Sequence, residues 1–129
     1  MTAKTASDPV VLDSSGWLEY ITVDTKADAA AQYVEGERPV LVPTIVLYEV
    51  YKKLKLSWGK VEADRFASQA MRRQVIPLGE GLALAAASVS LQHKLAMADA
   101  IIYTTALASQ AELITSDQAF SGLPGVTLL

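Results

Sequence analysis

Short, mostly apolar runs alternate along the chain with longer segments in which apolar residues recur at helical spacing. The runs predict strands at 10–12, 39–42, 75–78 and 112–115, with a further strand at 126–128. The segments between them predict helices at 17–21, 26–34, 43–56, 60–73, 80–93 and 98–109. Strands that alternate with helices are typical of a parallel sheet covered on both faces. We therefore expect a three-layer α/β fold with four to five short parallel strands.

Two local features of these helices can be predicted in more detail. Thr44 is a good candidate for the N-cap of helix 43–56, because a threonine hydroxyl can accept a hydrogen bond from the first turn. Helix 60–73 has a face shared by Val61, Phe66 and Ala70, which we expect to be buried.

The length fits a single domain, residues 1–129, with a sizeable core. Residues 1–8 are polar, lack the apolar centre of a signal peptide and are expected to form a flexible tail. No apolar run is long enough to span a membrane, and we expect no membrane partner.

Composition narrows the kinds of site that are possible. Apolar residues make up 51% of the chain and charged residues 19%, as in globular proteins. The absence of cysteine excludes disulfides and thiolate zinc sites and suits a cytoplasmic protein. The one histidine, His93, excludes a metal site built from several histidines.

Four acidic residues stand beside apolar segments, at the predicted strand ends or on helices that would face those ends. Asp13 follows the first strand and Asp117 follows the fourth, whereas Glu49 and Asp99 lie on predicted helices. Ligands of open parallel sheets bind beyond the carboxyl ends of the strands. If the fold brings the four carboxylates together, their oxygens suit Mg²⁺ or Mn²⁺.

Each acid also has a structural explanation. Asp13 could cap the helix that follows it, and the negative charge of Asp99 could stabilise the N-terminus of its own helix. Asp117 could begin a turn, and Glu49 could pair with the lysines three and four residues further on. Four such placements at one edge of a sheet make coincidence a weaker explanation than a shared site.

Positive charge is concentrated in residues 52–73, which contain seven basic and two acidic residues in a chain of net charge −3. Such a segment could bind a phosphate backbone or an inhibitory partner. A solvated helical surface would have the same composition.

Four motifs together resemble the PIN-domain ribonucleases, specifically the VapC-type toxins of type II toxin–antitoxin systems. They are VLDSSGWLEY at 11–20, PTIVLYEV at 43–50, ADAIIYTTA at 98–106 and LITSDQAF at 113–120. The resemblance extends from Val10 to Leu128. It implies a PIN-like domain that hydrolyses RNA phosphodiester bonds with the help of a divalent metal ion.

The resemblance also implies the roles of the four acids, all of them catalytic. Asp13 and Asp99 would ligate Mg²⁺, or Mn²⁺, directly, and Glu49 and Asp117 would complete the shell directly or through water.

The fourth motif departs from the family's pattern. Many relatives have a further acid where this chain has Ala119, and Arg or Asn where it has Ser116. Asp117 is then the only acid of this motif, so a second metal ion would have one carboxylate fewer to bind it than in those relatives. Ser14 and Thr115 could hydrogen-bond the carboxylates or water.

The family context implies three partners: an RNA substrate, a cognate antitoxin and a second copy of the chain in a homodimer. Helix 45–56 and its end carry more large apolar side chains than one buried face uses: Tyr48, Tyr51, Leu54 and Trp58. Those left over could form the dimer or antitoxin surface, or all of them could be core.

Two other functions fit the same features: a receiver-like signalling domain with bound Mg²⁺, and a non-catalytic PIN-like binding module. A receiver needs a lysine after a late strand, and nothing after Lys94 is basic.

Overall fold

A five-stranded sheet forms the centre of the protein, whose computed structural model describes residues 8–129. The strand order is β3-β2-β1-β4-β5, and every neighbouring pair is parallel. The strands are β1 (Val10–Leu12), β2 (Val40–Pro43), β3 (Gln74–Ile76), β4 (Glu112–Thr115) and β5 (Val126–Leu128). The predicted parallel sheet is therefore confirmed, with all five strands present.

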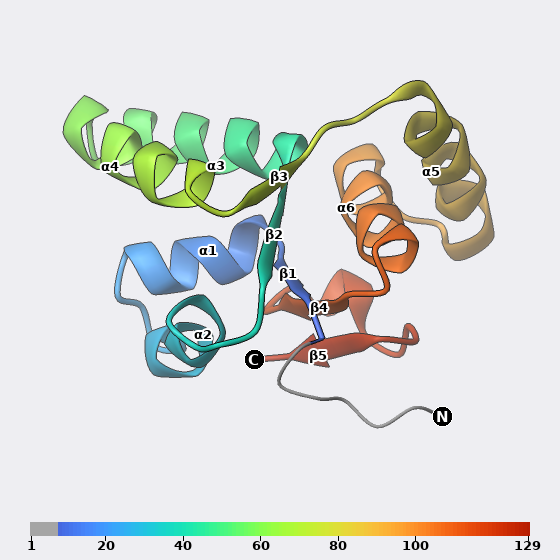
Figure 1. The fold of residues 1–129 in the computed structure, drawn as a ribbon, viewed down its shortest axis with the longest axis horizontal. Coiled ribbons are helices and arrows are strands. Elements are labelled where there is room, and N and C mark those ends of the chain that lie inside the picture. The colour runs from blue at the N-terminus through green and yellow to red at the C-terminus, as the bar shows by residue number, and fades with distance from the viewer. Residues whose placement is uncertain (1–7) are drawn as a thin grey trace.

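Helices cover both faces of this sheet. Figure 1 shows α1 to α4 on one side and α5 and α6 on the other, which makes the three layers expected from the sequence. The helices are α1 (Ser14–Ile21), α2 (Ala27–Val34), α3 (Thr44–Ser57), α4 (Lys60–Met71), α5 (Glu80–His93) and α6 (Met97–Ala108), and a 3₁₀ turn, η1, spans Gln118–Phe120.

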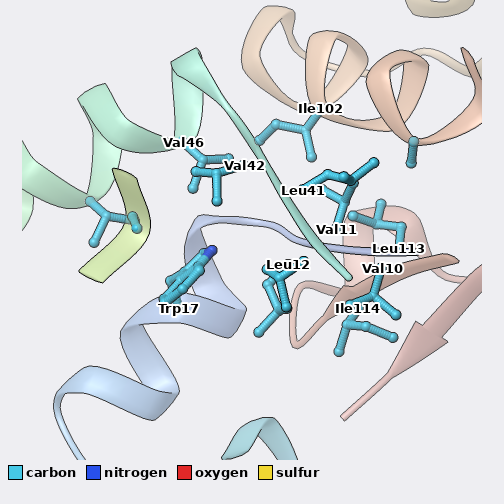
Figure 2. Packing of buried hydrophobic residues seen from close by; sticks show 14 of the residues in the cluster. Val10, Val11, Leu12, Trp17, Leu41, Val42, Val46, Ile102, Leu113 and Ile114 are labelled. Atoms are coloured by element: carbon cyan, nitrogen blue, oxygen red, sulfur yellow. The ribbon is translucent and has the colours of Figure 1, made fainter. Parts of the chain in front are cut away.

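The core lies on both faces of β1, the middle strand of the sheet. Its three residues are fully buried, because successive side chains point to opposite faces and each face is covered by helices. In Figure 2, Val11 lies on the side of Ile102 of α6, whereas Leu12 lies on the side of Trp17 of α1. The Trp17 ring packs edge-on against Phe66 of α4, with ring centroids 5.5 Å apart. The strand that ends at Asp13 is thus held from both sides.

Helix α1 begins at Ser14, three residues before the predicted start at 17. Asp13 supplies the N-cap, so the helix begins immediately after β1. The predicted cap at Thr44 is wrong. Pro43 occupies the N-cap position of α3, no side chain caps the helix there, and Thr44 is its first helical residue. Proline has the fixed φ and missing N–H that suit a helix start.

The buried face of α4 also differs from the prediction. Val61 is 69% exposed, and the side chains that pack inward are Ala63, Phe66 and Ala70. These three positions follow the i, i+3, i+7 spacing of one helix face. The sequence pattern favoured Val61 over Ala63 because valine is the larger apolar residue.

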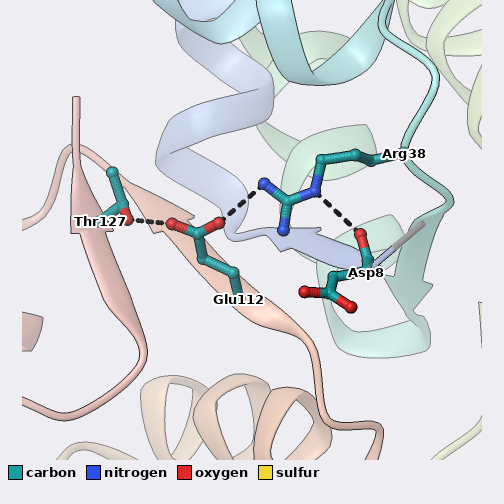
Figure 3. Close-up of polar contacts among 4 residues, drawn as sticks. All are labelled: Asp8, Arg38, Glu112 and Thr127. Carbon is teal, nitrogen blue, oxygen red and sulfur yellow. Dashed lines mark hydrogen bonds and ion pairs between the residues drawn. The ribbon is translucent and has the colours of Figure 1, made fainter. Parts of the chain in front are cut away.

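A charged cluster joins the strands near their amino ends, opposite the edge where Asp13 and Asp117 lie. Figure 3 shows Arg38 between Asp8 and Glu112. The Arg38 Nη1 atom lies 2.8 Å from Glu112 Oε1, and its Nε donates to the Asp8 carbonyl at 2.8 Å. Thr127 of β5 donates to the other Glu112 oxygen. Pairing of this kind makes a buried carboxylate tolerable in the core.

Two expectations concern the ends and surface of the chain. Of the expected flexible tail, residues 1–7 lie outside the described residues. Within residues 8–129, every helix is too short or too polar to cross a bilayer.

Candidate active site

Asp13 is buried at the carboxyl end of β1 and accepts three hydrogen bonds. Its Oδ1 accepts from Gly16 N at 2.9 Å and from Ser15 Oγ at 2.7 Å, and its Oδ2 accepts from Thr115 Oγ1 at 2.7 Å. Burial raises the pKa of Asp13 above its usual 3.8, the three donors oppose that rise, and Asp117 adds to it. The structural role of Asp13 as the cap of α1 is therefore confirmed.

Gly16 lets the first turn of α1 approach the end of β4. A Cβ atom at this position would lie 3.2 Å from the Ile114 carbonyl oxygen and 3.3 Å from Leu12 Cβ. Because glycine has no such atom, Asp13 can reach the Thr115 hydroxyl across the sheet. The glycine of the first motif thus helps to assemble the site.

Glu49 approaches from α3 and is half-buried. Its Oε1 accepts a hydrogen bond from Ser14 Oγ at 2.5 Å, which confirms the prediction that Ser14 binds a carboxylate. The alternative pairing is wrong, because neither Lys52 nor Lys53 forms an ion pair with Glu49. The bond instead fixes α3 to the N-terminus of α1, one residue beyond Asp13.

Asp117 is exposed and begins the 3₁₀ turn η1. Its side chain accepts from Ala119 N at 2.9 Å, so the turn-forming role is confirmed. Its own N–H donates to Thr115 Oγ1 at 2.9 Å. Since the Thr115 hydroxyl donates to Asp13, one buried threonine links the first and fourth motifs. This confirms the expected role of Thr115.

Asp99 differs from the other three acids in having no partner. It lies in the first turn of α6 and is half-buried, and its carboxylate makes no hydrogen bond or ion pair with any of residues 8–129. Burial, followed by the negative charges of Asp117, Asp13 and Glu49, raises its pKa to about 6. The fold therefore brings all four acids into one electrostatic group, with no basic side chain contributing to the Asp99 pKa.

The chemistry of this group suits a hard divalent cation. Carboxylate oxygens are the usual ligands of Mg²⁺ and Mn²⁺, and a cation would remove the repulsion that raises the Asp99 pKa. With the side chains as they lie in the structure, no three His, Asp or Glu residues among residues 8–129 are close enough together to hold a metal ion. Shared coordination by three or more of the acids therefore requires their side chains to move.

Ser15 is a site residue that the sequence analysis missed. Its hydroxyl donates to Asp13 and accepts from Ser116 N at 3.0 Å, so it connects the first motif to the fourth. The signal was the consecutive pair of serines after Asp13, of which only Ser14 was assigned a role. The Ser116 backbone, rather than its side chain, makes this contact.

The apolar side chains of α3 divide between core and surface. Leu54 is buried, and Tyr51 is half-buried with its hydroxyl donating to Asp64 at 2.8 Å. Tyr48 and Trp58 are exposed, so the expectation that all four belong to the core is wrong. Of these four side chains, Tyr48 and Trp58 are the two that are exposed to a partner.

The model of the PIN-domain family matches residues 10–126, a span that contains all four motifs and all four acids. The chain belongs to the PIN-domain family. The receiver-like alternative is accordingly wrong, and the strand order here also differs from the 2-1-3-4-5 order of receiver domains.

Solved structures share this PIN fold over nearly the whole chain. A toxin–antitoxin complex from Klebsiella pneumoniae is 23% identical, with a TM-score of 0.78, covering 92% of this chain and 95% of that one. VapC20 from Mycobacterium tuberculosis, described as a sarcin–ricin loop cleaving toxin, is 17% identical, with a TM-score of 0.76 and coverage of 91% and 96%.

DNA-bound VapBC from Salmonella typhimurium is 14% identical, with a TM-score of 0.73 and coverage of 95% and 97%. No curated protein matches the sequence significantly. At these identities the structures show that this PIN domain has the fold of VapC toxins.

Proposed function

We propose that this PIN domain is a metal-dependent endoribonuclease and the toxin of a toxin–antitoxin pair. Membership of the PIN-domain family and the fold shared with VapC toxins support the class. The observation that carries the proposal is the state of Asp99. Asp99 is half-buried, has no partner and is close to three more carboxylates. Its negative charge therefore destabilises the fold unless a cation binds beside it.

Each acid has a defined task in this proposal. Asp13, held by three donors, and Asp99, free of donors, are the direct ligands of Mg²⁺ or Mn²⁺. Glu49 and Asp117 complete the shell directly or through water. When bound, the ion lowers the pKa of a bound water and neutralises charge on the phosphate. Ser15 and Thr115 hold the Asp13 carboxylate in one orientation.

The proposed partners are an RNA substrate and a cognate antitoxin, and the proposed place of action is the cytoplasm. The structural neighbours support the antitoxin, because several are toxin–antitoxin complexes. The exposed side chains of Tyr48, in the second turn of α3, and Trp58, just after its last turn, leave room for a protein or RNA along that helix.

We propose that a homodimer forms through α5 and α6 rather than through α3. Ala86 is the only fully buried residue of α5, although the helix is largely apolar. Leu84 is 73% exposed, Leu91 84% and Met97 72%. A cavity of about 540 Å³ between α5 and α6 continues this apolar surface. A helix that is apolar on all sides is normally buried, and a second copy would bury this one.

Cleavage of RNA by purified protein tests the function. A pool of cellular RNA is incubated with the wild type or with Asp99→Asn, in Mg²⁺, in Mn²⁺ or in chelator, and circular dichroism checks folding. We expect discrete fragments from the wild type only when metal is present, and none from the variant. Cleavage in chelator, or equal cleavage by folded Asp99→Asn, would contradict the proposal. A folded wild type that never cleaves would favour the non-catalytic binding module.

A further inference from the structure

A shallow cavity of about 270 Å³ lies on the exposed face of α3, immediately beside the acid group. Its walls are Tyr48, Glu49, Lys52, Lys53 and Leu56, which lie along one stripe of the helix. Glu49 is thus shared between the cavity and the proposed metal site, so a molecule bound in the cavity would lie beside one of the four acids.

The charges of the basic segment 52–73 are not equivalent. Several of its cations are already engaged with acids or backbone carbonyls: Lys60 with Asp64, Arg65 with Glu62, Arg72 with the Ser68 carbonyl and Arg73 with the Val34 carbonyl. Lys52 and Lys53 form no ion pair with any acid in residues 8–129. They are therefore positive charges next to the site that no acid neutralises, and the Lys52 ammonium donates to the Tyr48 hydroxyl at 3.5 Å.

Tyr48 places an aromatic ring at the same spot. It is 60% exposed, and the Lys52 ammonium lies 5.5 Å from its ring centroid. An exposed ring flanked by lysines is the combination that binds single-stranded nucleic acid, since bases stack on the ring and phosphates pair with the cations. The remaining wall, Leu56, is apolar and exposed.

We propose that this cavity is a nucleotide subsite for the RNA strand next to the scissile bond. One base stacks on Tyr48, and the phosphate that follows it lies between Lys52 and Lys53. The subsite rests on the proposed nuclease function and adds to it the residues that position the substrate. It also answers an electrostatic requirement, because four carboxylates repel a phosphate backbone unless cations beside them offset that repulsion.

The helix itself offers a matched control. Lys55 lies 5.9 Å from the ring centroid of Tyr51, which repeats the arrangement of Lys52 and Tyr48 on the same helix. The Tyr51 ring is half-buried, however, and its hydroxyl donates to Asp64 of α4. Lys55→Ala therefore removes one positive charge from the same helix without touching the subsite.

Steady-state cleavage of a short single-stranded RNA, at several salt concentrations, tests the subsite. For Lys52→Ala/Lys53→Ala we expect KM to rise about tenfold at low salt, with kcat unchanged and a weaker dependence of KM on salt. For Tyr48→Ala we expect a rise of about fivefold or more, with Tyr48→Phe close to wild type. Lys55→Ala should match the wild type in KM and in its salt dependence.

Binding measured separately keeps the subsite and the nuclease function distinguishable. Fluorescence anisotropy of a labelled RNA oligonucleotide is followed with Asp99→Asn, alone and combined with the lysine or tyrosine substitutions. Weaker RNA binding in the combined variants supports the subsite even if no cleavage is found. The subsite would be overturned if RNA affinity and KM were unchanged in both the lysine and the tyrosine variants. The cavity would then be assigned to another occupant, such as an acidic protein segment.

Discussion

Replacing Asp99 with asparagine should stabilise the metal-free protein at neutral pH. The pKa of Asp99 rises from 3.8 to about 6 on folding, because the carboxyl is partly buried and faces three other acids. Between these two values the folded protein binds a proton that the unfolded chain does not, so stability falls as pH rises through this window. Above about pH 6 the penalty is fully present, and asparagine removes it.

The size of the effect follows from the same pKa. A rise to about 6 corresponds to about 3 kcal/mol if the group were shielded from solvent. Asp99 is only half-buried, so screening reduces this to about 1.5 kcal/mol. The ionised carboxylate in the first turn of α6 also gains about 0.5 kcal/mol from the helix dipole, which asparagine loses. We expect a net gain of about 1 kcal/mol, or roughly 3–6 °C in melting temperature.

Thermal melts of both proteins at pH 4 and pH 7.5, in chelator and in Mg²⁺ or Mn²⁺, measure this. In chelator the variant should melt higher at pH 7.5, and the two proteins should nearly coincide at pH 4. Metal at a hundred times its dissociation constant should stabilise the wild type by about 2.7 kcal/mol and reverse the order at pH 7.5. A variant that melts lower in chelator at pH 7.5 would show that Asp99 makes a stabilising contact, and the electrostatic argument would be refuted.

Three further predictions test two contacts that support the site and the proposed dimer surface. Gly16→Ala should lower stability by about 1–2 kcal/mol in urea unfolding, because its Cβ meets the Ile114 carbonyl at 3.2 Å and that clash exceeds the gain in helix propensity; an unchanged midpoint would mean that α1 can shift. Thr115→Val should cost about 1–3 kcal/mol and reduce cleavage, since Asp13 loses a buried donor; wild-type cleavage would contradict its orienting role. Leu91→Glu should convert a dimer to a folded monomer in light scattering, whereas an unchanged mass would exclude the α5 surface.

The sequence predicted the centre of the sheet well because β1, β2 and β4 are buried on both faces. Such strands read as short apolar runs, and the bounds of β1 and β4 were predicted to the residue. Helix ends were less predictable, since they depend on local capping. Thr44 looked like a cap, but the preceding Pro43 took that position. Val61 looked like core because it is large and apolar, yet the smaller Ala63 faces inward.

The site could be predicted only in part, because its contacts join segments far apart in the sequence. Strand ends indicated where Asp13 and Asp117 lie, and the motifs indicated Glu49 and Asp99. No pattern in the sequence shows that Ser14 bonds Glu49, or that Ser15 reaches the Ser116 backbone. These bonds depend on how closely α1 approaches α3 and β4, which only the assembled fold determines. Whether the four acids bind metal stays a prediction.

The position of β1 in the sheet has a consequence for how the protein is made. β1 leaves the ribosome first, but one of its two neighbours, β4, begins only at Glu112. The bond between Asp13 and Thr115 spans 102 positions, and Asp99 and Asp117 are also late in the chain. Until Thr115 has left the ribosome, the nascent chain therefore holds Asp13 with only two of its three donors, Ser15 and Gly16. For the proposed nuclease, this delays activity until Asp99, Thr115 and Asp117 have all left the ribosome.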